Sequence, residues 1–235
     1  MRVAVVTGVG RRAGIGFAIV RRLLDDGYRV LAHAWPAAEA AVRDELGPEL
    51  VWVEADFADP DAPQRVIDAA IDAFGGVDVL VANHARDSAQ SLDAVTAEEL
   101  DVTFAVNARA VVLLVKAFAA QGRRDGRVVL FTSGQHLGAM AGELPYAISK
   151  GAVHQMTRSL SAAVAGQRIT VNAVNPGPVD TGWPSDELRD ELRSAFPAGR
   201  WGRPEDIAPV VAWLASADSG WVTGQVIDAE GGFRR

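Results

Sequence analysis

Short apolar segments alternate with longer amphipathic segments along the whole chain. The apolar segments are rich in Val, Ile and Leu and show little alternation of apolar and polar positions, which is typical of strands buried on both faces. They predict strands at Arg2–Val6, Arg29–His33, Leu50–Glu54, Val77–Val81, Arg127–Thr132, Arg168–Val174 and Gln225–Asp228. The segments between them predict helices at roughly Gly14–Asp26, Ala37–Leu46, Asp61–Phe74, Ala97–Gln121, Pro145–Ala165 and Pro204–Ala215.

This alternation predicts an α/β protein in which one parallel sheet is covered by helices on both faces. Because crossovers between parallel strands are right-handed, the pattern favours a doubly wound sheet, and 235 residues suit a single domain over 1–235. The long irregular stretch Asn175–Gly202 contains four prolines. Long loops in compact domains are usually functional, so residues 178–202 are predicted to form a lid over the substrate. The alternative is a surface loop without a functional role.

Composition narrows the class of protein. A net charge of −7 argues against nucleic-acid binding, which depends on Lys and Arg. The chain has no cysteine, which excludes disulfides and thiolate zinc sites, and no metal site is predicted. The first residues lack the features of a signal peptide. The longest apolar stretch, Ala108–Ala120, carries Arg109 and Lys116 and is too short for a membrane span, so a cytoplasmic protein without membrane association is expected.

The first predicted strand leads into a glycine-rich segment, TGVGRRAGIG at residues 7–16. Its glycines are Gly8, Gly10, Gly14 and Gly16, a longer spacing than G-x-G-x-x-G. Backbone N–H groups at the start of a helix bind phosphate without side-chain charge, and glycines let the backbone approach closely. The segment predicts a pyrophosphate turn, with Gly8 in the tight turn and Gly14 and Gly16 opening the helix. A structural glycine bend is the alternative.

Candidate catalytic residues lie further along the chain. Tyr146 and Lys150 are four residues apart and share one helix face. An ammonium beside a phenol lowers the phenol pKa, which suits proton transfer to or from a carbonyl or alcohol oxygen, although an isolated Y-x-x-x-K is more often structural. Ser133 follows a buried strand, at the sheet edge where ligands bind. Asn107 is a polar amide in an apolar helix and needs partners, either as a satisfied core residue or as a contact to water or lysine.

Together these segments resemble the short-chain dehydrogenase/reductase superfamily, over nearly the whole chain and in the family's order. The glycine segment is similar to the family's T-G-x-x-x-G-x-G loop with two additional residues, and A-N-H-A at 82–85 is similar to its N-N-A-G motif. The residues Asn107, Ser133, Tyr146 and Lys150 match its catalytic tetrad. Segments near the end of the chain resemble reductases of 3-oxoacyl thioesters. The resemblance implies a single-domain Rossmann fold with a seven-stranded sheet and an NAD(P)-dependent oxidoreductase that transfers a hydride.

The resemblance also implies residue roles. Tyr146 would be the general acid/base, and Lys150 would lower its pKa and bind the nicotinamide ribose. Ser133 would position the reacting oxygen, and Asn107 would hold a water in a proton relay to solvent. The residues expected to contact the cofactor are Gly8, Gly10, Arg11, Arg12, Gly14, Ile15, Gly16, His33, Asp56, Phe57, Asn83, Tyr146, Lys150, Pro176, Gly177, Val179 and Thr181.

The end of the second predicted strand bears on the choice of cofactor. Residues 31–35 offer no carboxylate that would bind an adenine ribose 2′-hydroxyl and repel a 2′-phosphate. Arg11 and Arg12 lie in the glycine segment, where a guanidinium could pair with a 2′-phosphate, and a protonated His33 could add to that. NADP(H) is therefore favoured over NAD(H). The alternative is that both arginines point to solvent.

The expected substrate is a small-molecule carbonyl or alcohol. Candidate contacts lie near the tetrad and in the lid, at His84, Gln135, His136, Leu144, Pro178 and Trp183. A dinucleotide-binding sensor or scaffold without turnover is the alternative, because the glycine segment and A-N-H-A depart from the family pattern. The helices at Ala97–Gln121 and after Pro145 are apolar on more than one face, which predicts a homotetramer or homodimer.

Overall fold

The computed structural model describes residues 1–47 and 50–234, so residues 48, 49 and 235 of the predicted domain lie outside the described part. Seven parallel strands form one sheet in the order β3-β2-β1-β4-β5-β6-β7. The strands are β1 (Val3–Thr7), β2 (Arg29–Ala34), β3 (Val51–Glu54), β4 (Val79–Ala82), β5 (Arg127–Phe131), β6 (Thr170–Asn175) and β7 (Val226–Asp228). The predicted doubly wound fold is confirmed.

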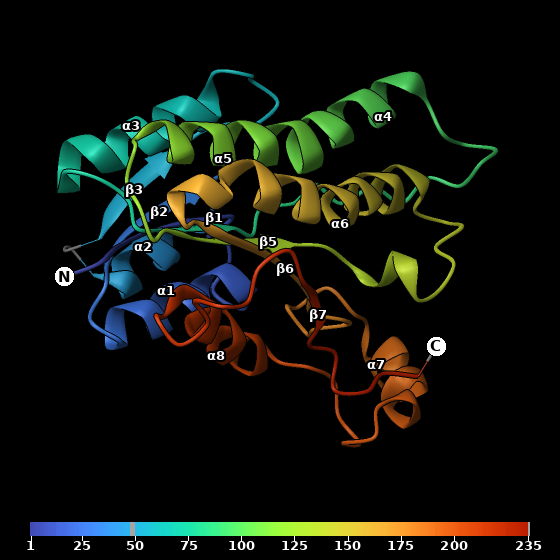
Figure 1. Cartoon of the computed structure of the whole chain (residues 1–235). Helices are drawn as coiled ribbons and strands as arrows, with labels where there is room; N and C mark the ends of the chain where they lie inside the picture. Colours follow the sequence, from blue (N-terminus) through green and yellow to red (C-terminus); the bar gives the residue numbers. More distant parts are fainter. Residues whose placement is uncertain (48–49, 235) are drawn as a thin grey trace.

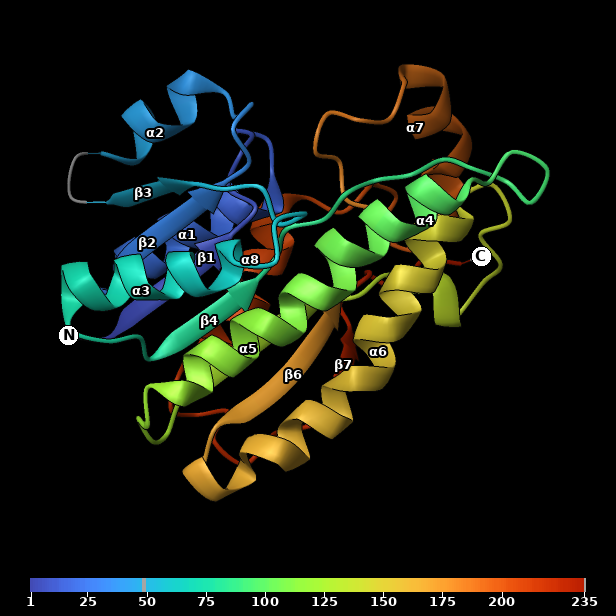
Figure 2. The ribbon, with the colours of Figure 1, turned by 90° about the horizontal axis from the view of Figure 1, so that it is seen from above.

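Helices cover both faces of the sheet. They are α1 (Ile15–Asp25), α2 (Ala40–Leu46), α3 (Ala62–Phe74), α4 (Ala97–Phe104), α5 (Ala110–Ala120), α6 (Leu144–Val164), α7 (Asp186–Leu192) and α8 (Pro204–Ala215). Figure 1 shows α3, α5 and α6 on one face and α1 and α8 on the other, and Figure 2 looks onto the first group. Each layer buries its own apolar cluster, because side chains of the fully buried strands point alternately to the two faces.

Two of the predicted helices differ from the sequence prediction by more than two residues or by an interruption. The helix predicted at Ala97–Gln121 is α4 and α5 joined by a π-helical turn at Ala105–Arg109. Such turns are rare in proteins, and those that occur are often found at functional sites. Helix α2 begins at Ala40 rather than Ala37, because residues 35–39 form a turn that is fastened to the glycine segment by the Glu39 N–H bond to the Gly10 carbonyl oxygen (2.9 Å).

The continuous helical segment Ala97–Ala120 is long and apolar enough to cross a membrane, judged by length and composition alone. Within the described part of the chain it is the one helix that passes this test. Just over half of its apolar window, 56%, is buried in the protein, where α5 packs against α3, α6 and the sheet. Burial of this kind is typical of a core helix, and the predicted absence of membrane association stays a prediction.

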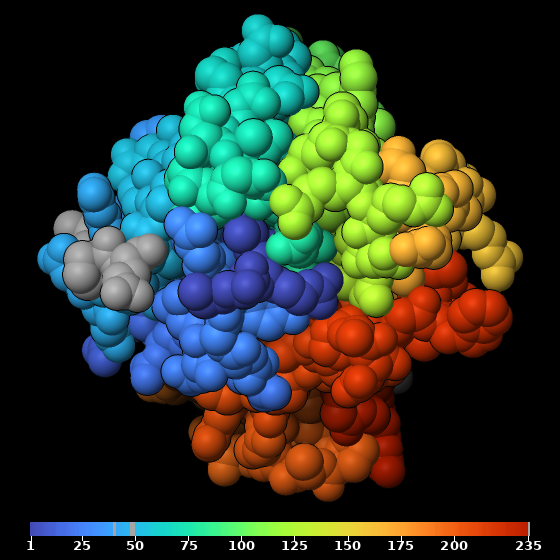
Figure 3. All heavy atoms as spheres, turned by 60° about the vertical axis from the view of Figure 1, so that its left-hand side comes forward, coloured from blue at the N-terminus to red at the C-terminus, as the bar shows by residue number. Residues whose placement is uncertain are grey.

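The two ends of the sheet differ. At the amino ends, the first residues of the chain lie among segments from distant parts of the sequence (Figure 3). Arg2, for example, donates to the Ala215 carbonyl oxygen at the end of α8 (2.6 Å). At the carboxyl ends the loops diverge and enclose a cavity, as expected for an open α/β sheet.

Candidate active site

A cavity of about 640 Å³ lies at the carboxyl ends of the strands. This volume is within the range of ~300–1,000 Å³ that is common for small-molecule sites. The predicted cofactor, substrate and catalytic residues that line it are Gly8, Gly10, Arg11, Gly14, Ile15, His33, Asp56, Phe57, Asn83, His84, Tyr146, Lys150, Pro176 and Thr181. One elongated site therefore collects most of the predicted cofactor contacts and two members of the tetrad.

Motif reasoning missed a second set of lining residues. They are Trp35, Ala37, Ala38, Ala55, Ala58, Ala85, Arg86, Asp87, Val102, Val106, Phe131 and Thr132. Most of them end a strand or follow it within a few residues, and that position is the signal that could have identified them. The other predicted cofactor contacts, Arg12, Gly16, Gly177 and Val179, lie outside this lining.

The glycine segment is packed tightly against the turn after β4. Gly8 has φ +77°, and a Cβ on it would lie 2.6 Å from the His84 Cα. A Cβ on Gly16 would lie 2.5 Å from the Gly8 carbonyl oxygen, whereas one on Gly10 would have 3.8 Å to its nearest neighbour. Asn83 fixes the segment by donating to the Thr7 and Gly8 carbonyl oxygens at 3.0 and 3.1 Å. Gly8 and Gly16 are thus required by backbone packing, while Gly10 is not.

The two arginines of the glycine segment point to different places. Arg11 lines the cavity. The Arg12 guanidinium instead pairs with Glu45 of α2 (Nε to Oε2, 2.6 Å), and its backbone N–H donates to the Glu39 carboxylate (3.0 Å). The prediction that Arg12 contacts the cofactor is not supported by this geometry, because two carboxylates hold that residue toward α2.

His33 is 2% exposed and stacks on Phe57 at 4.1 Å between ring centroids. Its Nε2 donates to the Ala55 carbonyl oxygen (3.1 Å), and burial lowers its pKa to about 4. The ring is therefore neutral at pH 7. The prediction that a protonated His33 helps to bind a 2′-phosphate is wrong for this structure, because desolvation removes the charge.

His84 takes the position where the family motif has a small residue. Its ring lies edge-on to Phe57 (4.4 Å), with Nδ1 2.7 Å from the Thr7 hydroxyl and Nε2 3.0 Å from the Val106 carbonyl oxygen. Because a carbonyl oxygen accepts, Nε2 carries the proton and the Thr7 hydroxyl donates to Nδ1. Burial holds the pKa of His84 well below its usual range. His84 is thus a neutral connector between β1 and the π-helical turn, and both ring nitrogens are already bonded.

Tyr146 and Lys150 lie one turn apart near the start of α6. The Ser133 side chain lies near enough to the Tyr146 phenol to influence its pKa. Burial raises the pKa of Tyr146 to about 12, a shift that the interaction with Ser133 opposes and that the carboxylates of Asp87 and Glu143 increase. The predicted lowering of the Tyr146 pKa is therefore wrong for this structure, because burial has the largest effect. The phenol is protonated at neutral pH.

Lys150 is 3% exposed. Its Nζ donates to the Phe131 carbonyl oxygen (2.9 Å) at the end of β5 and lies 5.7 Å from the centre of the Tyr146 ring. Burial lowers the pKa of Lys150 to about 8, so most of the side-chain population is charged at neutral pH. The ammonium is held close to the phenol by a main-chain contact.

Asn107 lies in the π-helical turn and is fully buried. Its amide donates to the Arg86 carbonyl oxygen and the Ser149 hydroxyl, both at 2.9 Å, and its Oδ1 accepts from the Arg86 N–H at 2.6 Å. Both amide hydrogens are thus used by the protein, and the side chain fastens the loop after β4 to α6. Asn107 therefore fits the first of the two alternatives from the sequence, a core residue whose hydrogen bonds are satisfied. A relay water would have to use the remaining Oδ1 lone pair.

Comparison with known proteins identifies the family. A family model described as enoyl-(acyl carrier protein) reductase matches residues 8–234. The uncharacterized oxidoreductase YjdA of Bacillus subtilis (strain 168) is 38% identical over 244 residues, covering 100% of this chain and 97% of that protein. A short-chain dehydrogenase/reductase from Serratia marcescens BCRC 10948 has a TM-score of 0.91 at 32% identity, covering 100% of this chain and 98% of the other. A blue fluorescent protein from a metagenomic library, solved in complex with NADPH, has a TM-score of 0.91 at 36% identity with the same coverage.

The chain belongs to the short-chain dehydrogenase/reductase family. The predicted family and the oxidoreductase class are thereby confirmed.

The predicted substrate contacts are scattered in this family member. Of them, His84 alone lines the cavity. Gln135 donates to the Thr132 hydroxyl (3.2 Å), and its Oε1 is buried without a partner among the described residues. His136 contacts Asp228, and the Leu144 N–H donates to the Gln90 carbonyl oxygen. These side chains surround the loop after β5 and the start of α6, outside the cavity wall.

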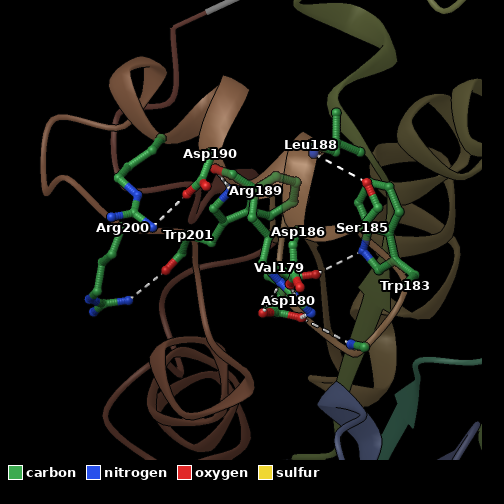
Figure 4. A network of polar contacts seen from close by, with 12 residues as sticks. Val179, Asp180, Trp183, Ser185, Asp186, Leu188, Arg189, Asp190, Arg200 and Trp201 are labelled. Carbon is green, nitrogen blue, oxygen red and sulfur yellow. Dashed lines mark hydrogen bonds and ion pairs between the residues drawn. The ribbon is translucent and has the colours of Figure 1, made fainter.

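The predicted lid, 178–202, is a closed loop with its own polar network (Figure 4). A parallel bridge between Val179 and Gly202 joins its two ends. Arg189 of α7 pairs with Asp180 (Nε to Oδ2, 2.9 Å), and the Trp183 indole donates to the Val179 carbonyl oxygen (2.9 Å). Trp183 remains 56% exposed, and neither it nor Pro178 lines the cavity. Cover of the substrate by this loop stays a prediction.

Proposed function

We propose that this chain is an NADP(H)-dependent reductase of a small-molecule ketone or aldehyde. The observation that carries the proposal is the single cavity that joins the glycine segment, at Gly8, Gly10 and Gly14, to the Tyr146–Lys150 pair. Since Tyr146 is the proton donor in this proposal, the reacting carbonyl belongs at its end. The part of the cavity that is lined by the segments after β2 and β3 would then bind the adenosine.

The residues present fit a dinucleotide. Gly8 and Gly16 bring two backbone segments so close that a Cβ would clash, which leaves the backbone of the turn available to a pyrophosphate. The first residue of α1, Ile15, lines the cavity, so the positive end of that helix faces it. When bound, the nicotinamide supplies the hydride, and the protein supplies binding and orientation.

The protonated phenol favours reduction. A Tyr146 with a pKa of about 12 holds its proton at neutral pH and can donate it to the oxygen of a carbonyl substrate. Ser133, which interacts with that phenol, would orient the same oxygen. The charged Lys150 stabilises the negative charge that develops on the phenol as its proton leaves.

Arg11 supports the preference for NADP(H). It is the arginine of the glycine segment that lines the cavity, and no carboxylate from β2 lines the cavity wall among the described residues. A guanidinium there can form charge-assisted hydrogen bonds with a 2′-phosphate. The similar protein solved with NADPH is consistent with this choice.

The proposal is tested by two measurements on the same preparation. NADPH and NADH are titrated by fluorescence, and oxidation of the preferred cofactor is then followed with a panel of ketones and aldehydes. We expect tight NADPH binding and turnover that Tyr146→Phe lowers by about 10²–10⁴-fold, the scale of a general acid, with cofactor affinity retained. Binding without turnover of any carbonyl would favour the sensor or scaffold, and full activity of Tyr146→Phe would remove the phenol from its role.

A further inference from the structure

The π-helical turn between α4 and α5 deprives one helix carbonyl of its regular donor. In an α-helix the Val106 carbonyl oxygen would accept from the N–H of Ala110, four residues further on. Here the Ala110 N–H donates to the carbonyl oxygen of Ala105 instead, five residues back. A side chain or a water must therefore replace the helical donor at Val106, which lies in the wall of the cavity.

His84 supplies that donor from the turn after β4. Its Nε2 lies 3.0 Å from the Val106 carbonyl oxygen, and because a carbonyl only accepts, Nε2 carries the proton. Nδ1 is then the acceptor, 2.7 Å from the hydroxyl of Thr7, which is fully buried at the end of β1. The backbone N–H of His84 also donates to this hydroxyl (3.3 Å). The ring is thus anchored on β1 and directs its N–H to the helix.

The π-helical turn places Asn107 between the loop after β4 and α6. The Asn107 amide donates to the Arg86 carbonyl oxygen and to the Ser149 hydroxyl. The Ser149 hydroxyl in turn donates to the carbonyl oxygen of Tyr146 (2.7 Å). A run of contacts therefore leads from His84, through the turn, to the part of α6 that carries Tyr146.

The position of Asn107 depends on the extra residue that the turn accommodates. Successive residues of an α-helix are about 100° apart around its axis. If the Val106 carbonyl regained the Ala110 N–H, the turn would lose one residue. The side chains on its two sides would then rotate relative to each other by about that angle. Because α4 and α5 both pack against α6, such a rotation would move Asn107 away from Ser149.

We propose that His84 is a positioning residue that maintains the register of the π-helical turn and thereby holds Asn107 against Ser149. Through Ser149 it fixes the first turns of α6, where the proposed proton donor Tyr146 lies. The side chain provides a hydrogen bond that the helix itself does not supply. The contacts stand on hydrogen-bond geometry, and their kinetic consequence rests on the proposed function.

Crystal structures of two variants of the full chain test the contacts without turnover. His84→Gln keeps a donor and an acceptor on one amide, whereas His84→Ala removes both. We expect His84→Gln to retain the π-helical turn and the hydrogen bond between Asn107 and Ser149. In His84→Ala the Ala110 N–H should return to the Val106 carbonyl oxygen, and Asn107 should leave Ser149. A His84→Ala structure in which the turn and Asn107 are unchanged would overturn the proposal.

NMR of the unaltered protein gives a second test that needs no variant to fold. The nitrogen chemical shifts of the His84 ring identify the atom that carries the proton. We expect the proton on Nε2, and we expect it to exchange slowly with water because the ring is buried and bonded to Val106. A proton on Nδ1, or fast exchange of the Nε2 proton, would contradict the hydrogen bond to the turn.

The kinetic consequence is tested with the carbonyl substrate and cofactor that the protein turns over. We expect His84→Ala to lower kcat by about ten- to a hundredfold, the scale of a misplacement of about 1 Å, with a smaller change in the KM for the cofactor. His84→Gln should recover most of that loss. His154→Gln is the matched control, because His154 lies on α6 outside the cavity wall, and it should keep the original kcat.

The outcomes separate this proposal from the proposed function. A role in stability alone would lower the thermal midpoint of His84→Ala and leave kcat per folded molecule unchanged. That result would overturn the positioning role and leave the reductase intact. If the unaltered protein turns over no carbonyl, the proposed function fails, and the ring nitrogen shifts and the variant structures still decide whether His84 holds the turn.

Discussion

The Lys150 ammonium nitrogen lies 5.7 Å from the centre of the Tyr146 ring and is held there by the Phe131 carbonyl oxygen, 2.9 Å away. Burial moves the pKa values of the two groups in opposite directions, to about 8 for Lys150 and about 12 for Tyr146. The protein thus keeps a protonated phenol beside an ammonium that titrates first. The order of these two titrations determines the pH behaviour of the proposed reaction.

The kcat/KM for carbonyl reduction should fall as the pH rises through about 8, where Lys150 loses its charge. The sign follows from the lowered pKa, since the base is charged below 8 and neutral above it, while Tyr146 stays protonated up to about 12. A pH profile of kcat/KM measures this directly, because it reports groups of the free enzyme. Lys150→Arg keeps the charge and should remove this limb, and Lys150→Met should be poorly active at every pH. A profile that is flat to pH 10 would contradict the assignment.

Arg11 and Arg12 form a matched pair for cofactor preference. Arg11→Ala should weaken NADPH binding by about ten- to a hundredfold, the equivalent of about 1.5–3 kcal/mol for a hydrogen bond to a charged group. NADH binding should change little, because it lacks the 2′-phosphate. Arg12→Ala is the control, since that guanidinium is paired with Glu45 and points toward α2. Paired titrations of both variants decide the question, and a selective NADPH loss in Arg12→Ala would reverse the assignment.

His33 should make the fold sensitive to acid. Its pKa is lowered from 6.5 to about 4 in the folded protein. Between these two pH values His33 is therefore protonated in the unfolded chain and neutral in the folded chain. The contribution of neutral His33 to the free energy of unfolding is fully present above pH 6.5. It is lost as the pH falls toward 4, which lowers the free energy of unfolding by roughly 3 kcal/mol. Urea unfolding at pH 7 and pH 4.5 should show a smaller difference for His33→Gln, whose amide can still donate to the Ala55 carbonyl oxygen. An unchanged difference would assign the acid sensitivity to other groups, of which the buried His84 is the first to replace.

The predicted homo-oligomer has a candidate surface on α4 and α6. A groove of about 560 Å³ there is lined by Leu100, Asp101, Phe104, Ala105, Arg109, Pro145 and Ile148. Phe104 is 48% and Ile148 56% exposed, and a second copy of the chain would cover both. Ile148→Glu should lower the sedimentation coefficient to that of a monomer. Trp221→Ala is the control, because Trp221 is 99% exposed and does not line this groove. A monomeric unaltered protein would contradict the oligomer.

The fold could be predicted because its determinants are local and repeated. Apolar segments without alternation, each followed by an amphipathic segment, leave a doubly wound parallel sheet as the arrangement that buries them. The ends of elements could be predicted less closely, because they depend on contacts outside the element. Helix α2, for instance, starts late because the Glu39 N–H bonds to the Gly10 carbonyl oxygen, far from it in the sequence.

The sequence by itself determined the family, the sheet and the identity of the residues at the strand ends, because motif spacing and apolar patterning can be recognised from the order of residues alone. Tertiary structure alone decided the direction in which each side chain points and the medium that surrounds it. Arg12 turned to Glu45 rather than into the cavity, and His33 lost its charge by burial. The pKa of Tyr146 rose although a lysine lies one turn away, because burial has the largest effect and the carboxylates of Asp87 and Glu143 add to it. The burial and the pairing of a side chain depend on segments that are distant in sequence, so neither can be inferred from the spacing of residues along the chain.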